Sequence, residues 1–116
     1  YRNSDFNGAE MVNTGLAYTD FRWSNLSDVN LTGALIYGGG NWMSVDLSNA
    51  DLTNAMMWDL DLRYSNLTGA DLTGARLVEL NSVYGDAILD GVIWDWATCP
   101  DGTAAYYHGQ TCVNNL

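Results

Sequence analysis

The feature that most constrains this chain is a five-residue repeat that runs through most of its length. When the sequence is read in steps of five from its leucines, every central position is apolar. A small residue often lies two positions before the centre, Asp or Asn one position before it, and Ser or Thr one position after it. The alignment assumes single-residue insertions near Gly39 and Leu80. The predicted centres are Phe6, Met11, Leu16, Phe21, Leu26, Leu31, Ile36, Trp42, Leu47, Leu52, Met57, Leu62, Leu67, Leu72, Leu77, Val83, Ile88 and Ile93.

A period of five residues fits neither an amphipathic α-helix, which repeats about every 3.6 residues, nor a β-strand, which repeats about every two. It suits a solenoid in which each unit forms one side and ends in a turn, where Gly, Asn and Asp are tolerated. The residues at these turn positions include Gly8, Gly33, Asn49, Asn54, Gly69 and Gly74. The sequence therefore predicts a repeat solenoid.

The tandem motif A(D/N)L(S/T)x resembles the repeat of the pentapeptide-repeat family over roughly residues 4 to 95, and "SNLTGADLTGARL" matches it closely. The resemblance implies an all-β fold, a right-handed quadrilateral β-helix in which one pentapeptide forms each side of a coil. In that fold the central residue and the small residue two before it point inward. We therefore predict a β-helix over residues 1–95 and a capping tail over residues 96–116.

The tail contains both cysteines of the chain, Cys99 and Cys112. Two cysteines that close a short loop favour a disulfide over a metal site, which would need more ligands. We expect this loop to cover the last coil, because an open solenoid end exposes apolar side chains and unpaired backbone groups. A disulfide indicates a secreted, periplasmic or cell-surface protein. The chain lacks an initiator Met and begins inside the repeat, so we also expect a processed or trimmed N-terminus.

With four units per coil, residues about twenty apart stack on one face. The first face is centred on Phe6, Leu26, Leu47, Leu67 and Ile88, the second on Met11, Leu31, Leu52, Leu72 and Ile93, the third on Leu16, Ile36, Met57 and Leu77, and the fourth on Phe21, Trp42, Leu62 and Val83. The outward residues of the first two faces are mainly acidic or hydroxyl-bearing. The predicted acidic face comprises Asp5, Glu10, Asp28, Asp46, Asp51, Asp71, Asp86, Asp90 and Asp95.

The outward residues of the third and fourth faces are aromatic, aliphatic and cationic, and all four arginines lie there. Stacked coils are about 4.8 Å apart, so these side chains form one patch, and such patches often mark interaction sites. The predicted interface, which we call the aromatic–arginine surface, comprises Tyr18, Arg22, Trp23, Leu35, Tyr37, Met43, Met56, Trp58, Arg63, Tyr64, Arg76, Val78 and Tyr84. Two other interpretations stay open. The aromatics only stack on one another, or the frame slips near residues 38–40.

The composition argues against several functions. Fourteen acidic residues, four arginines and no lysine give a net charge of −10, which disfavours direct binding to nucleic-acid phosphates. No apolar run is long enough to span a membrane. His108 has no nucleophile placed beside it by a motif, so we predict no enzyme, no cofactor and no metal site. The run "GGG" at residues 38–40 is interpreted as a turn, or as relief beside Trp42, and not as a phosphate loop.

These observations predict a non-enzymatic extracellular structural protein that self-assembles into filaments or sheets. The acidic half of one copy would meet the arginine-bearing half of the next, a contact that does not close on itself. End-to-end stacking of coils is a second route. The family resemblance implies an alternative, because some pentapeptide-repeat proteins mimic duplex DNA and bind a type II topoisomerase. A third hypothesis is a glycan-binding module, in which the Trp and Tyr side chains stack on sugar rings.

Overall fold

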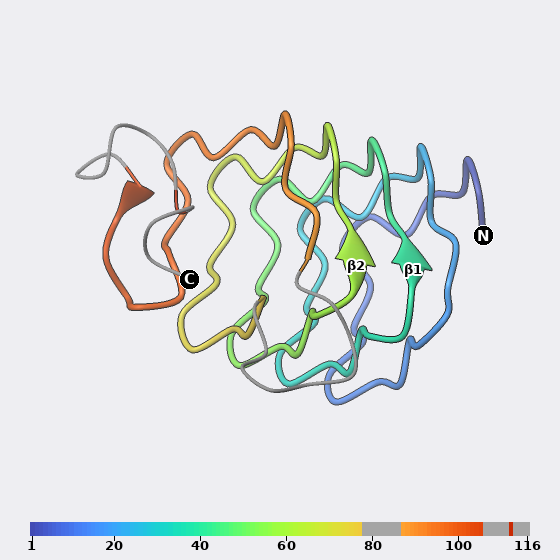
Figure 1. Cartoon of the computed structure of the whole chain (residues 1–116), viewed down its shortest axis with the longest axis horizontal. Helices are drawn as coiled ribbons and strands as arrows, with labels where there is room; N and C mark the ends of the chain where they lie inside the picture. The colour runs from blue at the N-terminus through green and yellow to red at the C-terminus, as the bar shows by residue number, and fades with distance from the viewer. Residues whose placement is uncertain (78–86, 106–111, 113–116) are drawn as a thin grey trace.

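The chain winds into successive coils along one axis, with the N-terminal coil (blue) at one end of the stack and the last described segment, up to residue 105 (orange to red), at the other (Figure 1). The computed structural model describes residues 1–77, 87–105 and 112. The strands are β1 (Gly40–Asn41) and β2 (Leu60–Asp61), which pair in parallel, and no helix lies in the described part of the chain. Further parallel bridges join residues four pentapeptides apart, such as Asp5 with Asn25 and Glu10 with Asn30, so the structure is the predicted four-sided β-helix.

Short parallel pairings join each coil to the next at the position before each centre. On the first face Asp5 pairs with Asn25, Asn25 with Asp46, and Asp46 with Asn66. Equivalent columns begin at Glu10 on the second face and at Gly15 on the third. Stacking of coils therefore follows the face assignment that the repeat predicts, as far as residue 77.

Each side of a coil ends in a hydrogen-bonded turn. The N–H three residues after a centre donates to the carbonyl of that centre, as Ala50 N does to Leu47 O at 3.1 Å. The residue two after the centre has a positive φ, the geometry of a type II turn, which Gly and Asn adopt most readily. Gly69 has a φ of 70° and Asn49 a φ of 56°. The predicted turn positions are confirmed, since all six have positive φ.

The Asp or Asn before each centre also has a local structural role. Its Oδ1 accepts a hydrogen bond from the backbone N–H two residues later, as Asp46 does from Ser48 N at 3.0 Å. We call this the Asx bond. It recurs before other centres at Asp5, Asp20, Asn25, Asn30, Asn41, Asp51, Asp61, Asn66 and Asp71, and a bond of the same kind forms in the tail at Asp101. The acidic character of the repeat is thus partly a requirement of the turns.

The interior is filled by the centres and by the small residues two before them. Leu26, Leu47 and Leu67 stack through the first face and are fully buried. Trp42 is also fully buried, and its Nε1 donates to Thr19 Oγ1 at 3.0 Å. These observations confirm the inward positions predicted for the first three coils.

The glycine run serves both purposes that the sequence suggested. Gly38 and Gly39 have positive φ values of 82° and 79° and form the turn with one extra residue. Gly40 lies inside the coil, where an added Cβ would come within 2.8 Å of Leu60 Cδ1 and 3.6 Å of Trp42 Nε1. Glycine at position 40 therefore makes room for the large Trp42 ring.

The last coil corrects the predicted register. Asp61 pairs with Ile88 and Asn66 with Ile93, so both isoleucines lie at outward positions and are 45% and 47% exposed. The assignment of Ile88 and Ile93 as inward centres was wrong. The inward residues of this coil are Leu89, Trp94 and Cys99, which follow Leu62, Leu67 and Leu72.

The reason for the error is the length of the insertion that follows Leu77 on the third face. The next described residue, Ala87, donates its N–H to Leu77 O at 2.8 Å, and Ile88 continues the fourth-face column after Asp61. The single-residue insertion assumed near Leu80 is too short to account for this pairing. The predicted centre Val83 lies outside the described residues.

The first residues of the C-terminal tail continue the β-helix, and the residues after them cap its end. Parallel pairing extends to Thr98, which also pairs antiparallel with Ala104, so the helix passes the predicted boundary at residue 95. Cys99 N donates to Thr103 O at 2.7 Å. The expected Cys99–Cys112 disulfide is present, and both cysteines are fully buried. The disulfide therefore fastens the tail to the end of the core.

Replacing Asp46 with Ala is expected to lower the free energy of unfolding by about 1–2 kcal/mol. Asp46 Oδ1 accepts bonds from Ser48 N and from Asn66 Nδ2, and both are lost. Urea denaturation measures the change. The control is Asp95→Ala, which removes an exposed carboxylate outside the Asx positions and should change stability little. Equal losses in the two variants would contradict the role given to the Asx bond.

Candidate interaction surface

The third face departs from the repeat at the position before each centre. This column consists of Gly15, Leu35, Met56 and Arg76, each paired with the next. None of these side chains carries an acceptor for the Asx bond. Leu35 is 37% exposed and Met56 is half-buried. Apolar side chains therefore occupy positions where Asp or Asn would stabilise the turn through the Asx bond.

Beside this column, aromatic side chains stack along the third face. The ring centroids of Tyr37 and Trp58 lie 5.6 Å apart with an interplanar angle of 20°. The guanidinium carbon of Arg76 lies 5.5 Å from the centroid of the Trp58 ring, within range of a cation–π contact. The interpretation that outward aromatics stack on one another holds for this pair. It does not account for the aromatics at the corners.

Four corner positions carry large aromatic residues in a conformation that such residues rarely adopt. Tyr18, Trp23, Tyr64 and Trp96 have φ values of 58° to 62° and are 54% to 74% exposed. Positive φ is unfavourable for bulky residues, so these side chains do not help the turns to form. Tyr18, Trp23 and Tyr64 extend the apolar surface around the edges of the third and fourth faces. Trp96, a position that sequence reasoning missed, lies instead at the corner that follows the first face.

Glycines in the following coil hold two of these rings flat. An added Cβ on Gly38 would lie 2.8 Å from the Tyr18 ring, and one on Gly91 would lie 2.5 Å from the Tyr64 ring. Each tyrosine thus lies over a glycine of the next coil. The exposed rings are positioned before any partner arrives, which reduces the entropy lost on binding.

The arginines of the fourth face are paired with carboxylates of the same face. Arg2 and Arg22 both contact Asp20, at 2.6 and 2.7 Å, and Arg63 contacts Asp61 at 2.7 Å. The hydrogen bond from Arg22 holds the pKa of Asp20 well below its ordinary value, and the one from Arg63 lowers the pKa of Asp61. These arginines therefore neutralise nearby acids and do not make the surface cationic.

Two acidic residues lie on faces other than those predicted. Tyr64 N donates to the carbonyl of Asp90, which places Asp90 on the fourth face beside Arg63. Gly69 N donates to the carbonyl of Asp95, which places Asp95 on the first face instead of the second. Both corrections follow from the longer insertion before the last coil. Asp86 lies outside the described residues.

On the first and second faces, carboxylates are separated by amides. Asn25 Nδ2 donates to Asp5 Oδ1 at 3.0 Å, and Asn30 Nδ2 donates to Glu10 Oε2 at 2.8 Å. The carboxylates on these two faces are Asp5, Glu10, Asp28, Asp46, Asp51, Asp71 and Asp95. No arginine or lysine accompanies them. The rod is therefore strongly negative on one half and close to neutral on the other.

The predicted interface residues fall into three groups. Leu35, Tyr37, Met56, Trp58 and Arg76 lie together on the third face, and Arg22, Met43 and Arg63 form a column on the fourth. Tyr18, Trp23 and Tyr64 lie at corners. Val78 and Tyr84 lie outside the described residues. Among the described residues there is no cluster of His, Cys, Asp and Glu that could hold a metal ion, and no helix long and apolar enough to cross a membrane.

Sequence reasoning missed Ile88 and Ile93 as outward residues. A signal for the correct register was present, since "AILDG", "VIWDW" and "ATCPD" align as three units. In that alignment Ala87, Val92 and Ala97 take the small inward position, and all three pack in or against the core.

More than half of the chain matches the model of the family described as pentapeptide repeats, in eight copies over residues 2–33 and 43–79. The chain belongs to the pentapeptide-repeat family. The segment between the two matched ranges contains the glycine run, where the extra residue interrupts the period. The chain has no significant match among curated protein sequences.

Solved structures of pentapeptide-repeat proteins align with this chain, and HetL shows the same fold. HetL, involved in heterocyst differentiation regulation in the cyanobacterium Nostoc sp. strain PCC 7120, aligns with a TM-score of 0.53 and 21% identity over 86% of this chain and 53% of HetL. The Nostoc protein alr5209 is 36% identical over 77% of this chain and 63% of its own, with a TM-score of 0.43. QnrB1, a plasmid-mediated fluoroquinolone resistance protein, is 20% identical over 84% of this chain and 59% of QnrB1, with a TM-score of 0.40. The chain covers less than two thirds of each relative.

Acid is expected to destabilise the protein through the paired carboxylates. Because the folded pKa of Asp61 lies below its ordinary value, Asp61 contributes stability that is present above about pH 4 and lost as the pH falls further. The thermal midpoint should therefore fall between about pH 5 and about pH 3. Both Asp61→Asn and Arg63→Gln should show a shallower fall. A fall as steep as that of the parent chain in both variants would contradict the assignment.

Proposed function

We propose that this protein is a non-enzymatic interaction protein that self-assembles through the aromatic–arginine surface. The observation that carries the proposal is the third-face column, where Leu35 and Met56 replace residues that would form Asx bonds. A chain that forms this bond in nearly every other described column omits it where an exposed apolar surface results. Monomers seldom keep large apolar patches exposed, and Tyr, Trp, Met and Arg are typical of interface cores.

The distribution of charge favours contact between two copies of the same surface. Arg22 and Arg63 are already paired with Asp20 and Asp61, so they offer little net charge to an acidic face. Two acidic faces would repel each other, whereas two near-neutral aromatic surfaces would not. A contact of this kind is isologous and closes as a dimer, and stacking of coil ends would extend such dimers into filaments. This arrangement replaces the acid-to-arginine contact that the sequence suggested.

The disulfide supports a location in an oxidising compartment. Cys99 and Cys112 are both buried and bonded to each other at the cap. Such bonds persist in secreted, periplasmic and surface proteins. We therefore infer that assembly takes place outside the cytosol.

The double variant Leu35→Asn with Met56→Asp tests the proposal. It restores the residues usual in the repeat, so the free energy of unfolding should stay the same or rise. Self-association should weaken by about tenfold or more, because apolar contacts at the centre of an interface contribute most to binding. Sedimentation over a range of concentrations measures both the mass and its concentration dependence.

The matched control is Ile93→Asn, the same kind of substitution on the first face, which should leave self-association unchanged. A parent chain that stays monomeric at high concentration and low salt would overturn the proposal. Association that persists unchanged in the double variant would overturn it as well.

A second candidate function is mimicry of duplex DNA toward a type II topoisomerase. The observation that favours it is the acidic face, two flat sides that carry seven named carboxylates and no cation. Such a surface attracts proteins that bind phosphates. If this candidate is right, the protein inhibits or protects gyrase in a supercoiling assay, and Asp46→Asn with Asp71→Asn weakens the effect. No effect at micromolar protein would count against it. Glycan binding stays a prediction that no contact in the structure favours.

A further inference from the structure

The last coil carries a second apolar surface that is separate from the third face. Ile88 and Ile93 stand at the outward position before the centre, in columns otherwise made of Asp and Asn. They follow Asp61 and Asn66, both of which form Asx bonds, and neither isoleucine can form one. The isoleucines are nearly half exposed. The coil therefore gives up two stabilising bonds and exposes two aliphatic side chains instead.

Aromatic side chains connect and extend the two isoleucines into a strip. The Tyr64 ring lies over Gly91, the corner between Ile88 and Ile93. Trp96, at the next corner, is 73% exposed. We call the two isoleucines and Trp96 the C-terminal strip; it runs around one corner of the coil, with Ile88 on the fourth face, Ile93 on the first and Trp96 at the corner that follows. Buried Trp94 and Cys99 anchor the same coil, so the strip rests on a firm support.

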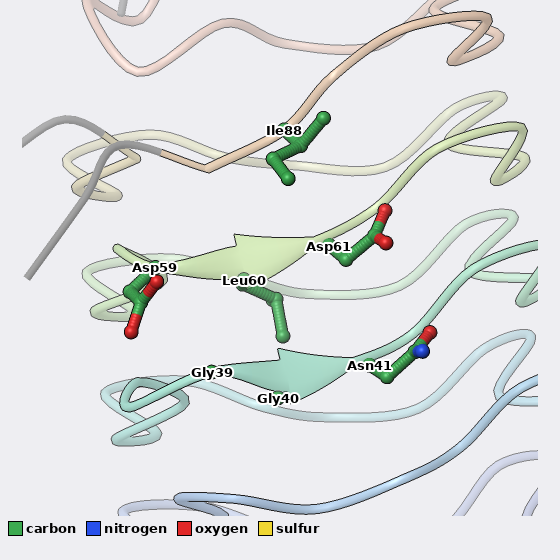
Figure 2. A pocket seen from close by; sticks show the side chains of 7 residues that line it. All are labelled: Gly39, Gly40, Asn41, Asp59, Leu60, Asp61 and Ile88. Carbon is green, nitrogen blue, oxygen red and sulfur yellow. The ribbon is translucent and has the colours of Figure 1, made fainter.

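The C-terminal strip is bordered by carboxylates. Asp90 and Asp95 are exposed and lie on the same coil. Asp90 follows Ile88 by two residues, and Asp95 follows Ile93 by two residues. Ile88 also lines a pocket of about 380 Å³ formed by β1, β2 and their neighbours. Figure 2 shows Asp59 and Asp61 at the two ends of Leu60 along this pocket, with Ile88 on the next coil. Asp61 is already paired with Arg63, so the carboxylates that border the isoleucines and could meet a further cation are Asp59, Asp90 and Asp95.

We propose that the C-terminal strip binds a basic amphipathic segment of another protein. The apolar side chains of that segment would cover Ile88, Ile93 and Trp96, and its Lys or Arg side chains would meet Asp59, Asp90 and Asp95. This match of apolar stripe and flanking charge is how amphipathic helices dock on acidic surfaces.

The charge of the strip argues against the other occupants. A second copy docking by the same strip would bring Asp90 and Asp95 close to their counterparts on a chain whose net charge is −10. An anionic membrane surface would be repelled for the same reason. The chain contains no lysine, and its fourth-face arginines are paired with Asp20 and Asp61. A basic partner is therefore the occupant that the electrostatics select.

The test uses a synthetic amphipathic helical peptide in which lysines flank a leucine stripe. Its binding to the full chain is measured by fluorescence anisotropy, and its position by NMR shifts of the isoleucine methyl groups. Binding should move the Ile88 and Ile93 signals. A peptide with serine in place of leucine, and one with glutamate in place of lysine, should each bind about tenfold or more weakly.

The decisive variant is Ile88→Asp with Ile93→Asn, which restores the usual residues of the repeat and the capacity for Asx bonds. It should fold at least as stably as the parent and bind the leucine–lysine peptide about tenfold or more weakly. Leu35→Asn is the matched control on the third face, and it should leave peptide binding unchanged.

Three outcomes would overturn the inference. Undiminished binding of the serine–lysine peptide, or undiminished binding by the double variant, would mean attraction to the acidic face alone. Binding of the glutamate peptide as tight as that of the leucine–lysine peptide would show that the carboxylates do not select a basic partner. Absence of binding at millimolar peptide would also refute it. Because Leu35→Asn tests the other surface, failure here leaves the proposed self-assembly to be judged on its own data.

Discussion

The structure depends on one repeated constraint: each unit must turn the chain through a corner and still place an apolar side chain inside. The backbone meets it with a turn whose third residue has positive φ, and with the Asx bond from the residue before the centre. Parallel hydrogen bonds to the next coil then fix the height of every unit, as Leu47 N does with Asn66 O at 2.8 Å. Inward positions have no freedom under this constraint. Outward positions have some, and their departures from the pattern carry the information about function.

The departures are grouped on two parts of the rod. On the third face, Leu35 and Met56 omit the Asx bond, and on the last coil Ile88 and Ile93 do the same. At the corners, Tyr18 and other aromatics occupy positive φ although glycine or asparagine would be favoured there. Each departure weakens the fold locally and exposes apolar area. That combination is what binding surfaces require. On the acidic first and second faces the same positions follow the repeat up to Asn66 and Asp71, and Ile93 departs from it only in the last coil.

Sequence reasoning succeeded where a residue's role depends on its own unit. The burial of Leu26 and Met57, the turn at Gly69 and the room left by Gly40 all follow from local periodicity, side-chain size and φ preference. It failed at Ile88, because the register of a coil after an insertion depends on which earlier strand it pairs with. Both Ile88 and Leu89 satisfy an apolar periodicity, and only the pairing of Ile88 with Asp61 distinguishes them.

The amino-acid sequence by itself determined the repeat, the inward residues of the first coils and the excess of negative charge, because the repeat and the inward positions arise within a few neighbouring residues and the charge from composition alone. The four-sided β-helix followed from the resemblance of that repeat to the pentapeptide-repeat family. The tertiary structure decided how the surfaces are composed. It paired Arg22 and Arg63 with acids of their own face, moved Asp90 beside Arg63 and turned Ile93 outward. The two arginine pairings join residues two apart in the same unit, so the structure shows them but they are local. The placement of Asp90 and Ile93 depends instead on contacts between different coils, and the length of one insertion sets which residues meet.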